Sequence, residues 1–257
     1  MDKTQIDLVN ERDNITGIFS PKNLIFDKIG FFNFGNWKGV DNSIEIAQIN
    51  LMETLVSFLV SRNENILDVG CGMGASARYL TKYFSPDKIT GINISEKQLE
   101  LCRVIAPKCN FRLMDATQLD FPDASFTNIL CIEAAPVFKT RNDFLKEAYR
   151  ILRNGGRIAI SDMFVGNRDR IAQHGVLWPE ENCFGNVHDY EERLIDTGFT
   201  YARVEDSTEF CIDAFNSFAS KATEQRVLDQ AEQASEMEKR RRNRDHGITC
   251  CLAYAIK

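Results

Sequence analysis

The chain has 257 residues, of which 44% are hydrophobic and 26% are charged, close to the usage of ordinary globular domains. Its formal net charge of −6 gives no reason to expect nucleic-acid binding, and the basic run at residues 239–244 follows an acidic stretch, as on a solvated helix face. With no signal-peptide layout and no apolar run of about 18 residues, we expect a soluble cytoplasmic protein without membrane contact.

The first 60 residues predict a helical or lid segment placed before the main domain. An aromatic loop occupies residues 31–37, and a helix is expected over residues 43–59. The aromatic side chains of the loop either pack in a core or cover a pocket, and the sequence leaves both roles open.

Short apolar runs alternate with helical patterns from residue 61 to residue 165. Strands are expected at residues 66–69, 89–94, 111–114, 126–132 and 158–161, and helices at 75–84, 96–105 and 142–152. This alternation is typical of a doubly wound, Rossmann-like α/β sheet whose strands are mostly parallel.

Residues 166–257 are expected to complete the same domain with cap helices and two more strands, for seven in all. A long connection leads to a helix over residues 190–197, an extended segment near 201–207, a helical region over 215–242 and a buried strand at 248–256.

The eight cysteines give no sign of a metal site. None forms a C-x-x-C pair, and most lie within apolar segments. We therefore expect reduced, buried thiols and no bound metal.

Polar side chains gather where the predicted strands end, which is where open α/β sheets bind ligands. Acids occupy four of these five positions, a pattern that favours a hydroxyl-rich or cationic ligand. The five residues are Asp68, Asn93, Asp115, Glu133 and Asp162.

The glycine-rich stretch at residues 66–74 turns the first strand into a helix and leaves the backbone bare at the turn. Gly70, Gly72 and Ala75 satisfy the G-x-G-x-x-G/A pattern of dinucleotide sites. That pattern also requires an acid about 20 residues later. Asn93 stands there instead, and a dinucleotide would leave Asp68 without a role.

The segment Asp68-Val-Gly-Cys-Gly-Met-Gly74 is similar to the first motif of class I S-adenosylmethionine-dependent methyltransferases. The resemblance covers roughly residues 60–165, and four later segments fall in the family's order. They are residues 91–95 continuing to Gln98, residues 114–116, residues 121–126 and residues 145–157.

The resemblance implies S-adenosylmethionine as cofactor, bound by a core of residues 61–165. Asp68 would orient its amino-acid end, while Asp115 would accept a hydrogen bond from its adenine amino group. Capping of a nearby turn is the alternative role for both acids. The implied cofactor-binding residues are Asp68, Gly70, Gly72, Asn93, Ser95, Gln98, Asp115, Ala116 and Glu133, the last of which could equally cap the next segment.

The same resemblance implies methylation of a small-molecule, natural-product-like acceptor, most readily at oxygen. Nitrogen or carbon acceptors and a non-catalytic S-adenosylmethionine-binding module are the alternatives, and a homo-oligomer is left open. An oxygen acceptor needs a base. Relatives often place a histidine after the fourth strand, but residues 134–138 contain none. We therefore expect Asp162 or His174 as the base, and substrate contacts from Phe34, Trp37 and Trp178.

Overall fold

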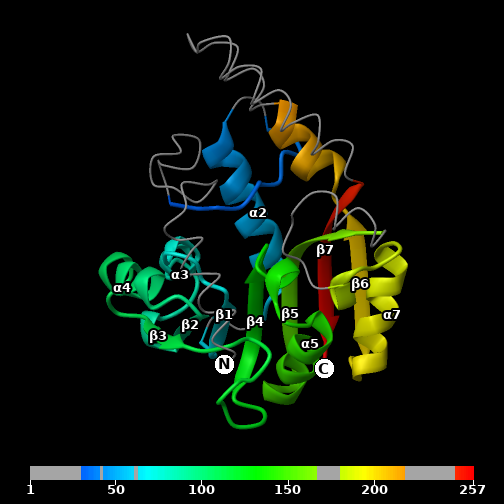
Figure 1. The fold of residues 1–257 in the computed structure, drawn as a ribbon. Helices are drawn as coiled ribbons and strands as arrows, with labels where there is room; N and C mark the ends of the chain where they lie inside the picture. The colour runs from blue at the N-terminus through cyan, green and yellow to red at the C-terminus, as the bar shows by residue number, and fades with distance from the viewer. Residues whose placement is uncertain (1–29, 41–42, 61–62, 167–179, 218–246) are drawn as a thin grey trace.

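The computed structural model describes residues 30–40, 43–60, 63–166, 180–217 and 247–257. Within these ranges, a seven-stranded sheet runs in the order β3-β2-β1-β4-β5-β7-β6 (Figure 1). Its strands are β1 (Ile66–Val69), β2 (Ile89–Asn93), β3 (Asn110–Leu113), β4 (Phe126–Ile132), β5 (Leu152–Val165), β6 (Tyr201–Asp206) and β7 (Ile248–Ile256). β7 runs antiparallel to both of its neighbours, while β1 to β5 are mutually parallel. The predicted fold class is confirmed.

Helices cover both faces of this sheet. They are α2 (Ile44–Phe58), α3 (Ala75–Leu80), α4 (Glu96–Ile105), α5 (Arg141–Ile151) and α7 (Val187–Thr197). Shorter helical turns lie at η1 (Pro86–Lys88), η2 (Ala135–Val137), η3 (Glu180–Asn182) and η4 (Glu209–Asp213). None of the helices in the described part of the chain is long and apolar enough to cross a membrane.

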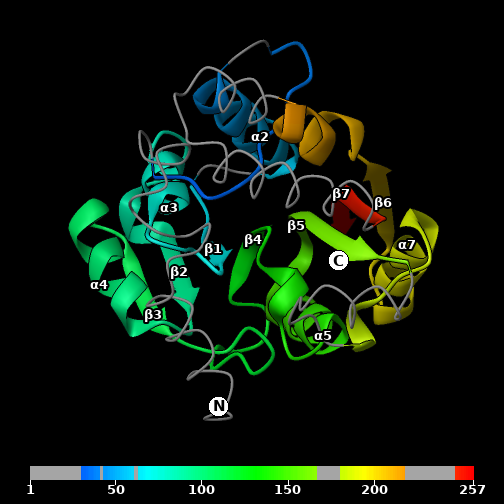
Figure 2. The same ribbon diagram turned by 45° about the horizontal axis from the view of Figure 1, so that its top comes forward.

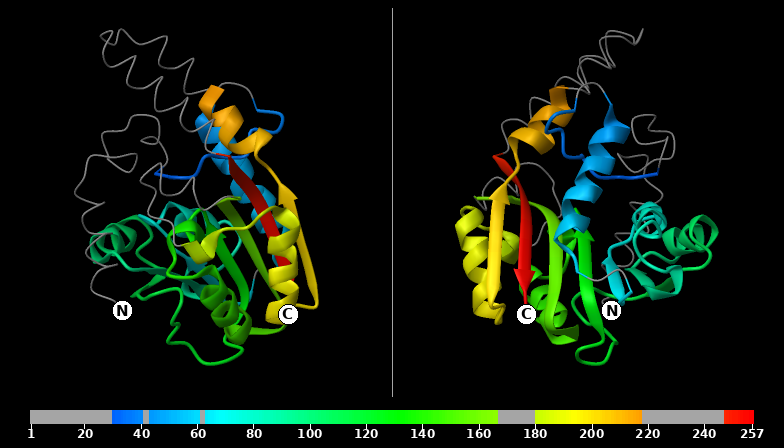
Figure 3. Two further views of the ribbon diagram at one scale, coloured as in Figure 1. Left: turned by 45° about the vertical axis from the view of Figure 1, so that its right-hand side comes forward. Right: turned by 180° about the vertical axis from the view of Figure 1, so that it is seen from behind.

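Alternation along the strands explains the two layers of core. Ile66 and Ala159 pack with α2 and α3 on one face, whereas neighbouring residues such as Leu67 pack with α5 and α7 on the other. Figure 3 shows α2 and α7 on opposite sides of the sheet. No disulfide joins the eight cysteines, and most of them are buried.

Two elements differ most from the sequence prediction. The helix expected to run to residue 84 ends at Leu80, because i→i+3 hydrogen-bonded turns replace α-helical bonds after it. The fifth strand is longer than expected, since it runs from Leu152 to Val165 and bulges between Leu152 and Arg157. Asp162 consequently lies inside β5, opposite Cys251 of β7, rather than at its end.

The strand order reverses at β1, which has β2 on one side and β4 on the other. Ligands of open α/β sheets bind at this point, beyond the carboxyl ends of the strands. Figure 2 brings that end of the sheet forward and shows residues 30–40, here called the strap, passing over it.

Candidate active site

The glycine loop between β1 and α3 is pressed against one neighbour and open on its other side. A Cβ at Gly70, where φ is +70°, would lie 2.4 Å from the Cβ of Ala134. A Cβ at Gly72 would meet nothing within 4 Å, although its φ of +52° also favours glycine. The loop backbone is held because the N–H groups of Gly70 and Cys71 donate to the carbonyl of Ile92. This leaves bare backbone facing a space that a ligand can occupy.

A cavity of about 60 Å³ lies between the glycine loop and the strap. The strap contributes Gly30 to Asn33, the loop contributes Gly70 to Met73, and Ile132 closes the side at the end of β4. Asp68 and the first residues of α3 form the floor. The cavity therefore coincides with the switch point of the sheet.

Asp68 is a buried carboxyl group at the floor of this cavity, with 1% of its surface exposed. Its Oδ2 accepts a hydrogen bond of 2.5 Å from the Ser76 hydroxyl. Burial raises the pKa of Asp68 to about 7, and the bond from Ser76 opposes that rise. A cation bound beside the carboxylate would favour its ionised form.

Glu133 links the end of β4 to the strap. Both of its carboxyl oxygens accept from the backbone N–H of Phe34, at 3.1 and 3.2 Å. Burial raises the pKa of Glu133 to about 8, while the Phe34 N–H lowers it and the charge of Asp162 raises it further. Its φ of +51° is unusual for a residue with a side chain, and such conformations gather at functional sites.

The strap is fastened to α2 by buried polar contacts. Gln48, which is 1% exposed, donates to the carbonyls of Phe31 and Asn33. A Cβ at residue 35 would lie 2.8 Å from that of Ala47, so the strap lies directly on the helix. Asn33 was missed by the sequence analysis, although it is the polar residue within a run of phenylalanines. Its side-chain oxygen is buried and has no hydrogen-bond partner within the described part of the chain.

The two aromatic strap residues predicted to contact substrate are packed among protein side chains. Trp37 is 7% exposed, belongs to a small core with Ala47 and Phe215, and donates from Nε1 to the Phe34 carbonyl. The Phe34 ring meets Phe215 edge to face, with centroids 4.9 Å apart. These contacts correspond to the core-packing role that the sequence left open, and substrate contact stays a prediction.

Three of the implied cofactor-binding residues come together at the end of β2. Asn93 donates from Nδ2 to the carbonyl of Gly72 and to Oε1 of Gln98, at 3.2 and 2.8 Å. Its Oδ1 accepts from the N–H of Ser95, whose hydroxyl in turn caps α4. This cluster supports the glycine loop from below.

Asp115 follows β3 and makes the turn-forming contacts that were its alternative role. Its Oδ1 accepts from both the N–H and the hydroxyl of Thr117, each at 2.8 Å. Ala116, the next of the implied cofactor-binding residues, is buried.

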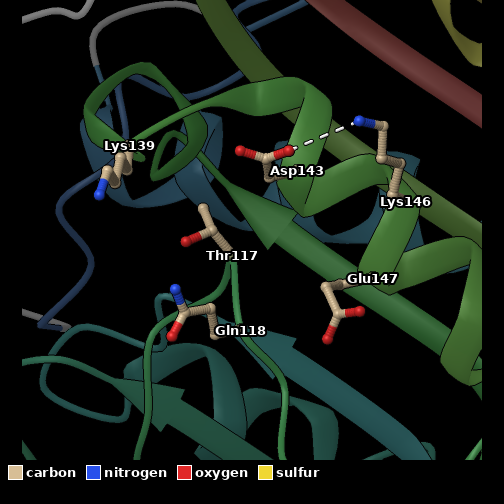
Figure 4. A pocket seen from close by; sticks show the side chains of 6 residues that line it. All are labelled: Thr117, Gln118, Lys139, Asp143, Lys146 and Glu147. Atoms are coloured by element: carbon tan, nitrogen blue, oxygen red, sulfur yellow. Dashed lines mark ion pairs between the residues drawn. The ribbon is translucent and has the colours of Figure 1, made fainter. Parts of the chain in front are cut away.

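Just beyond Asp115 lies a second cavity of about 270 Å³ between this turn and α5 (Figure 4). Its lining contains two lysines and two acidic residues, and Nζ of Lys146 lies 3.6 Å from Oδ1 of Asp143. The lining residues are Thr117, Gln118, Lys139, Asp143, Lys146 and Glu147.

Asp162, predicted as the base, is completely buried beneath the site. Its two oxygens accept from Nε and Nη2 of Arg141, at 2.7 and 3.0 Å. The hydroxyl of Tyr190 and the backbone N–H of residue 163 donate to the same carboxylate. A carboxylate that accepts four hydrogen bonds and has no exposed surface is poorly placed to take a proton from a substrate.

The structure does not place the remaining predicted base or the third predicted substrate contact. His174 and Trp178 lie outside the residues that the structure describes. A further histidine, His188, lies in the first turn of α7, where its exposed ring nitrogen Nε2 is 3.3 Å from Oε1 of Glu192. Its backbone N–H donates to Asn186, so Asn186 caps this helix.

Comparisons with known proteins identify the family. The methyltransferase domain family matches residues 67–160. An O-methyltransferase of Pyrenophora dematioidea is 32% identical over 66% of this chain and 68% of its own length. The chain belongs to the class I S-adenosylmethionine-dependent methyltransferases. The resemblance drawn from the sequence motifs is thereby confirmed.

The chain is also similar to other methyltransferases. The 27-O-demethylrifamycin SV methyltransferase of Amycolatopsis mediterranei is 28% identical over 73% of each chain. Geranyl diphosphate C-methyltransferase of Streptomyces coelicolor A3(2) shares the fold, with a TM-score of 0.73 and 15% identity over 99% of this chain and 97% of its own. Several other curated methyltransferases are matched over 46% to 64% of their own length.

Proposed function

We propose that this methyltransferase methylates an oxygen atom of a small, natural-product-like molecule. The support comes from the relatives, since the Pyrenophora protein is named an O-methyltransferase and the Amycolatopsis protein acts on a demethylated rifamycin. Nitrogen and carbon acceptors are the alternatives, because the structural neighbours include a phosphoethanolamine N-methyltransferase and a geranyl diphosphate C-methyltransferase.

The main support for the proposed site is the bare backbone of the glycine loop, which lines one cavity together with the carboxyl group of Asp68. Gly72 has no atom near its missing Cβ, and Asp68 lies in the floor of the same cavity. Glu133 stands at the adjacent strand end with its pKa raised by burial. Carboxyl groups in such surroundings are stabilised in their ionised form by a cation, and S-adenosylmethionine carries a sulfonium and an ammonium.

When bound, the cofactor supplies an electrophilic methyl group. In the proposed arrangement, Asp68 and Glu133 hold its amino-acid end beside the glycine loop, and the β2 and β3 ends hold its ribose and adenine. The strap, part of the segment 1–60, excludes water above it, while residues 166–257 shape the acceptor pocket with Trp178. The remaining proposed contacts are Gly70, Gly72, Asn93, Ser95, Gln98, Asp115 and Ala116.

An oxygen acceptor must lose a proton, and the structure shifts our proposal for the base. The carboxylate of Asp162 is occupied by Arg141 and Tyr190, so we assign it a structural task beneath the pocket. His174 then remains the proposed base among the residues considered.

The test has two stages. Calorimetry should first show that the protein binds S-adenosylhomocysteine, and Asp115→Ala should weaken that binding by about 1–3 kcal/mol through loss of a hydrogen bond. Incubation with a metabolite extract and methyl-labelled S-adenosylmethionine should then yield a product carrying the label on oxygen, read by mass spectrometry. A label on nitrogen or carbon would move the activity to that alternative, and binding without any turnover would favour the non-catalytic module.

A further inference from the structure

The side-chain oxygen of Asn33 is a buried acceptor that lacks a donor. Asn33 is 4% exposed, and its Oδ1 has no hydrogen-bond partner among the described residues. Buried polar atoms are nearly always paired in native proteins. An orphan of this kind therefore needs an explanation, and a bound ligand that supplies the missing donor is one.

The position of Asn33 ties this acceptor to the cofactor cavity. Asn33 lines the same cavity as Asp68 and Gly70. The backbone around it is fixed from both sides, because Gln48 donates to the Asn33 carbonyl at 2.9 Å and Glu133 receives the N–H of the next residue. The main chain on either side of the Asn33 side chain is therefore held by hydrogen bonds.

Three parts of S-adenosylmethionine offer hydrogen-bond donors: the ammonium, the ribose hydroxyls and the adenine amino group. In the proposed site the ribose and adenine lie at the ends of β2 and β3, beside Asn93 and Asp115. The cavity of Asn33 instead joins the strap to β1 and to the last residue of β4. The donor nearest to this end of the cofactor is its ammonium.

We infer that Asn33 Oδ1 accepts a hydrogen bond from the ammonium of the bound cofactor and so makes the strap part of the binding site. This inference rests on the proposed function. A neutral amide suits the place, since Asp68 and Glu133 are already carboxyl groups whose burial disfavours their charge. The amide adds an acceptor for the cation without a third negative charge.

The inference is tested by two ligands that differ only at the proposed contact region. S-adenosylhomocysteine carries the amino-acid end, whereas 5′-methylthioadenosine lacks it. For Asn33→Leu at pH 8, calorimetry should show S-adenosylhomocysteine binding weakened about ten- to hundredfold, the range for a bond to a charged group. Binding of 5′-methylthioadenosine should be unchanged, and the ligand-free Tm should not fall, because the variant removes an orphaned acceptor.

Two further variants test whether the acceptor oxygen of Asn33 is the contacting atom and whether the effect is specific to this residue. Asn33→Asp retains the acceptor and should bind S-adenosylhomocysteine within a fewfold of the wild type. Asn36→Ala is the matched control on the same strap: its side chain bonds Thr54 and does not line the cavity, so both affinities should stay unchanged. Should Asn33→Leu fail to fold, Asn33→Ala carries the same comparison.

Equal loss of both ligands, or no loss of S-adenosylhomocysteine, would overturn the inference. So would an Asn33→Asp variant as weak as Asn33→Leu, since that would make the amide nitrogen the contacting atom. A wild-type protein that binds neither ligand would instead refute the proposed function.

Discussion

Replacing Asp162 with asparagine should destabilise the protein strongly without removing the catalytic base. The substitution leaves the guanidinium of Arg141 buried without its counter-charge, because both side chains have 0% exposure. Breaking a buried pair in this way costs about 3–5 kcal/mol. In a chain of this length, such a loss lowers the Tm by roughly 6–20 °C.

The assay is urea and thermal unfolding followed by circular dichroism, combined with a pH–rate profile of the folded enzyme. Glu96→Gln is the matched control, because Glu96 pairs with Arg103 at 2.7 Å with about half of each side chain exposed. Loss of that surface pair should cost less than about 1 kcal/mol. The reasoning would be refuted by an Asp162→Asn protein that unfolds like the wild type and has lost the acidic limb of its pH–rate profile.

Three more predictions concern the cofactor site. First, calorimetry should show that S-adenosylhomocysteine binds more tightly at pH 9 than at pH 6. The raised pKa values of Asp68 and Glu133 leave both carboxyl groups neutral at the lower pH, where they attract the ligand's ammonium less strongly. An affinity that does not change with pH would argue against contact between these carboxyl groups and the ligand. By the same linkage, the contribution of Asp68 and Glu133 to ligand-free stability should be greatest below pH 4 and should be lost as the pH rises through 7 and 8, since both pKa values are higher in the folded state than in the unfolded chain. Second, Gly70→Ala should lower the unfolding free energy more than Gly72→Ala, because the new methyl group clashes only at Gly70. Gly72→Ala should lower the unfolding free energy by about 1–2 kcal/mol, since its φ is positive, and should abolish S-adenosylhomocysteine binding. Equal binding by wild type and Gly72→Ala would show that no ligand lies on that side of the loop. Third, Gln48→Ala should expose the strap to limited proteolysis and cost about 1–3 kcal/mol, since two buried strap carbonyls lose their donor; an unchanged cleavage pattern would contradict that anchoring.

The fold could be predicted because its signals are local. The bounds of β1, β4, α4 and β7 follow apolar runs and helical spacing, and each matches the structure. The fifth strand was harder, because Gly155 and Gly156 are typical of a helix stop while the chain uses them in a bulge beside β4. Which of the two occurs is decided by pairing between strands, not by the glycines themselves.

The candidate site was predictable where motifs carry it and obscure where distant residues meet. Asp68, Gly70 and Gly72 were predicted from one short segment, and all three line the cavity beside the strap. By contrast, Asp162 looked accessible until Arg141 and Tyr190, far from it in sequence, proved to enclose it. No linear pattern shows that a residue 21 positions upstream donates hydrogen bonds to a carboxylate, and none shows that an amide oxygen lacks a donor.

The placement of β7 has a consequence for how the sheet is assembled. β7 pairs with β5 on one side and with β6 on the other, and β6 has no other neighbour among the described strands. β6 is made about 40 residues earlier, yet it cannot join the sheet until residues 248–256 have inserted between it and β5. The cofactor half of the protein, β1 to β4, needs no such delay. Folding should therefore proceed from the cofactor half outward, with β7 and β6 added last, because the pairing of β7 with β5 joins residues farther apart in sequence than any other strand pair of this sheet.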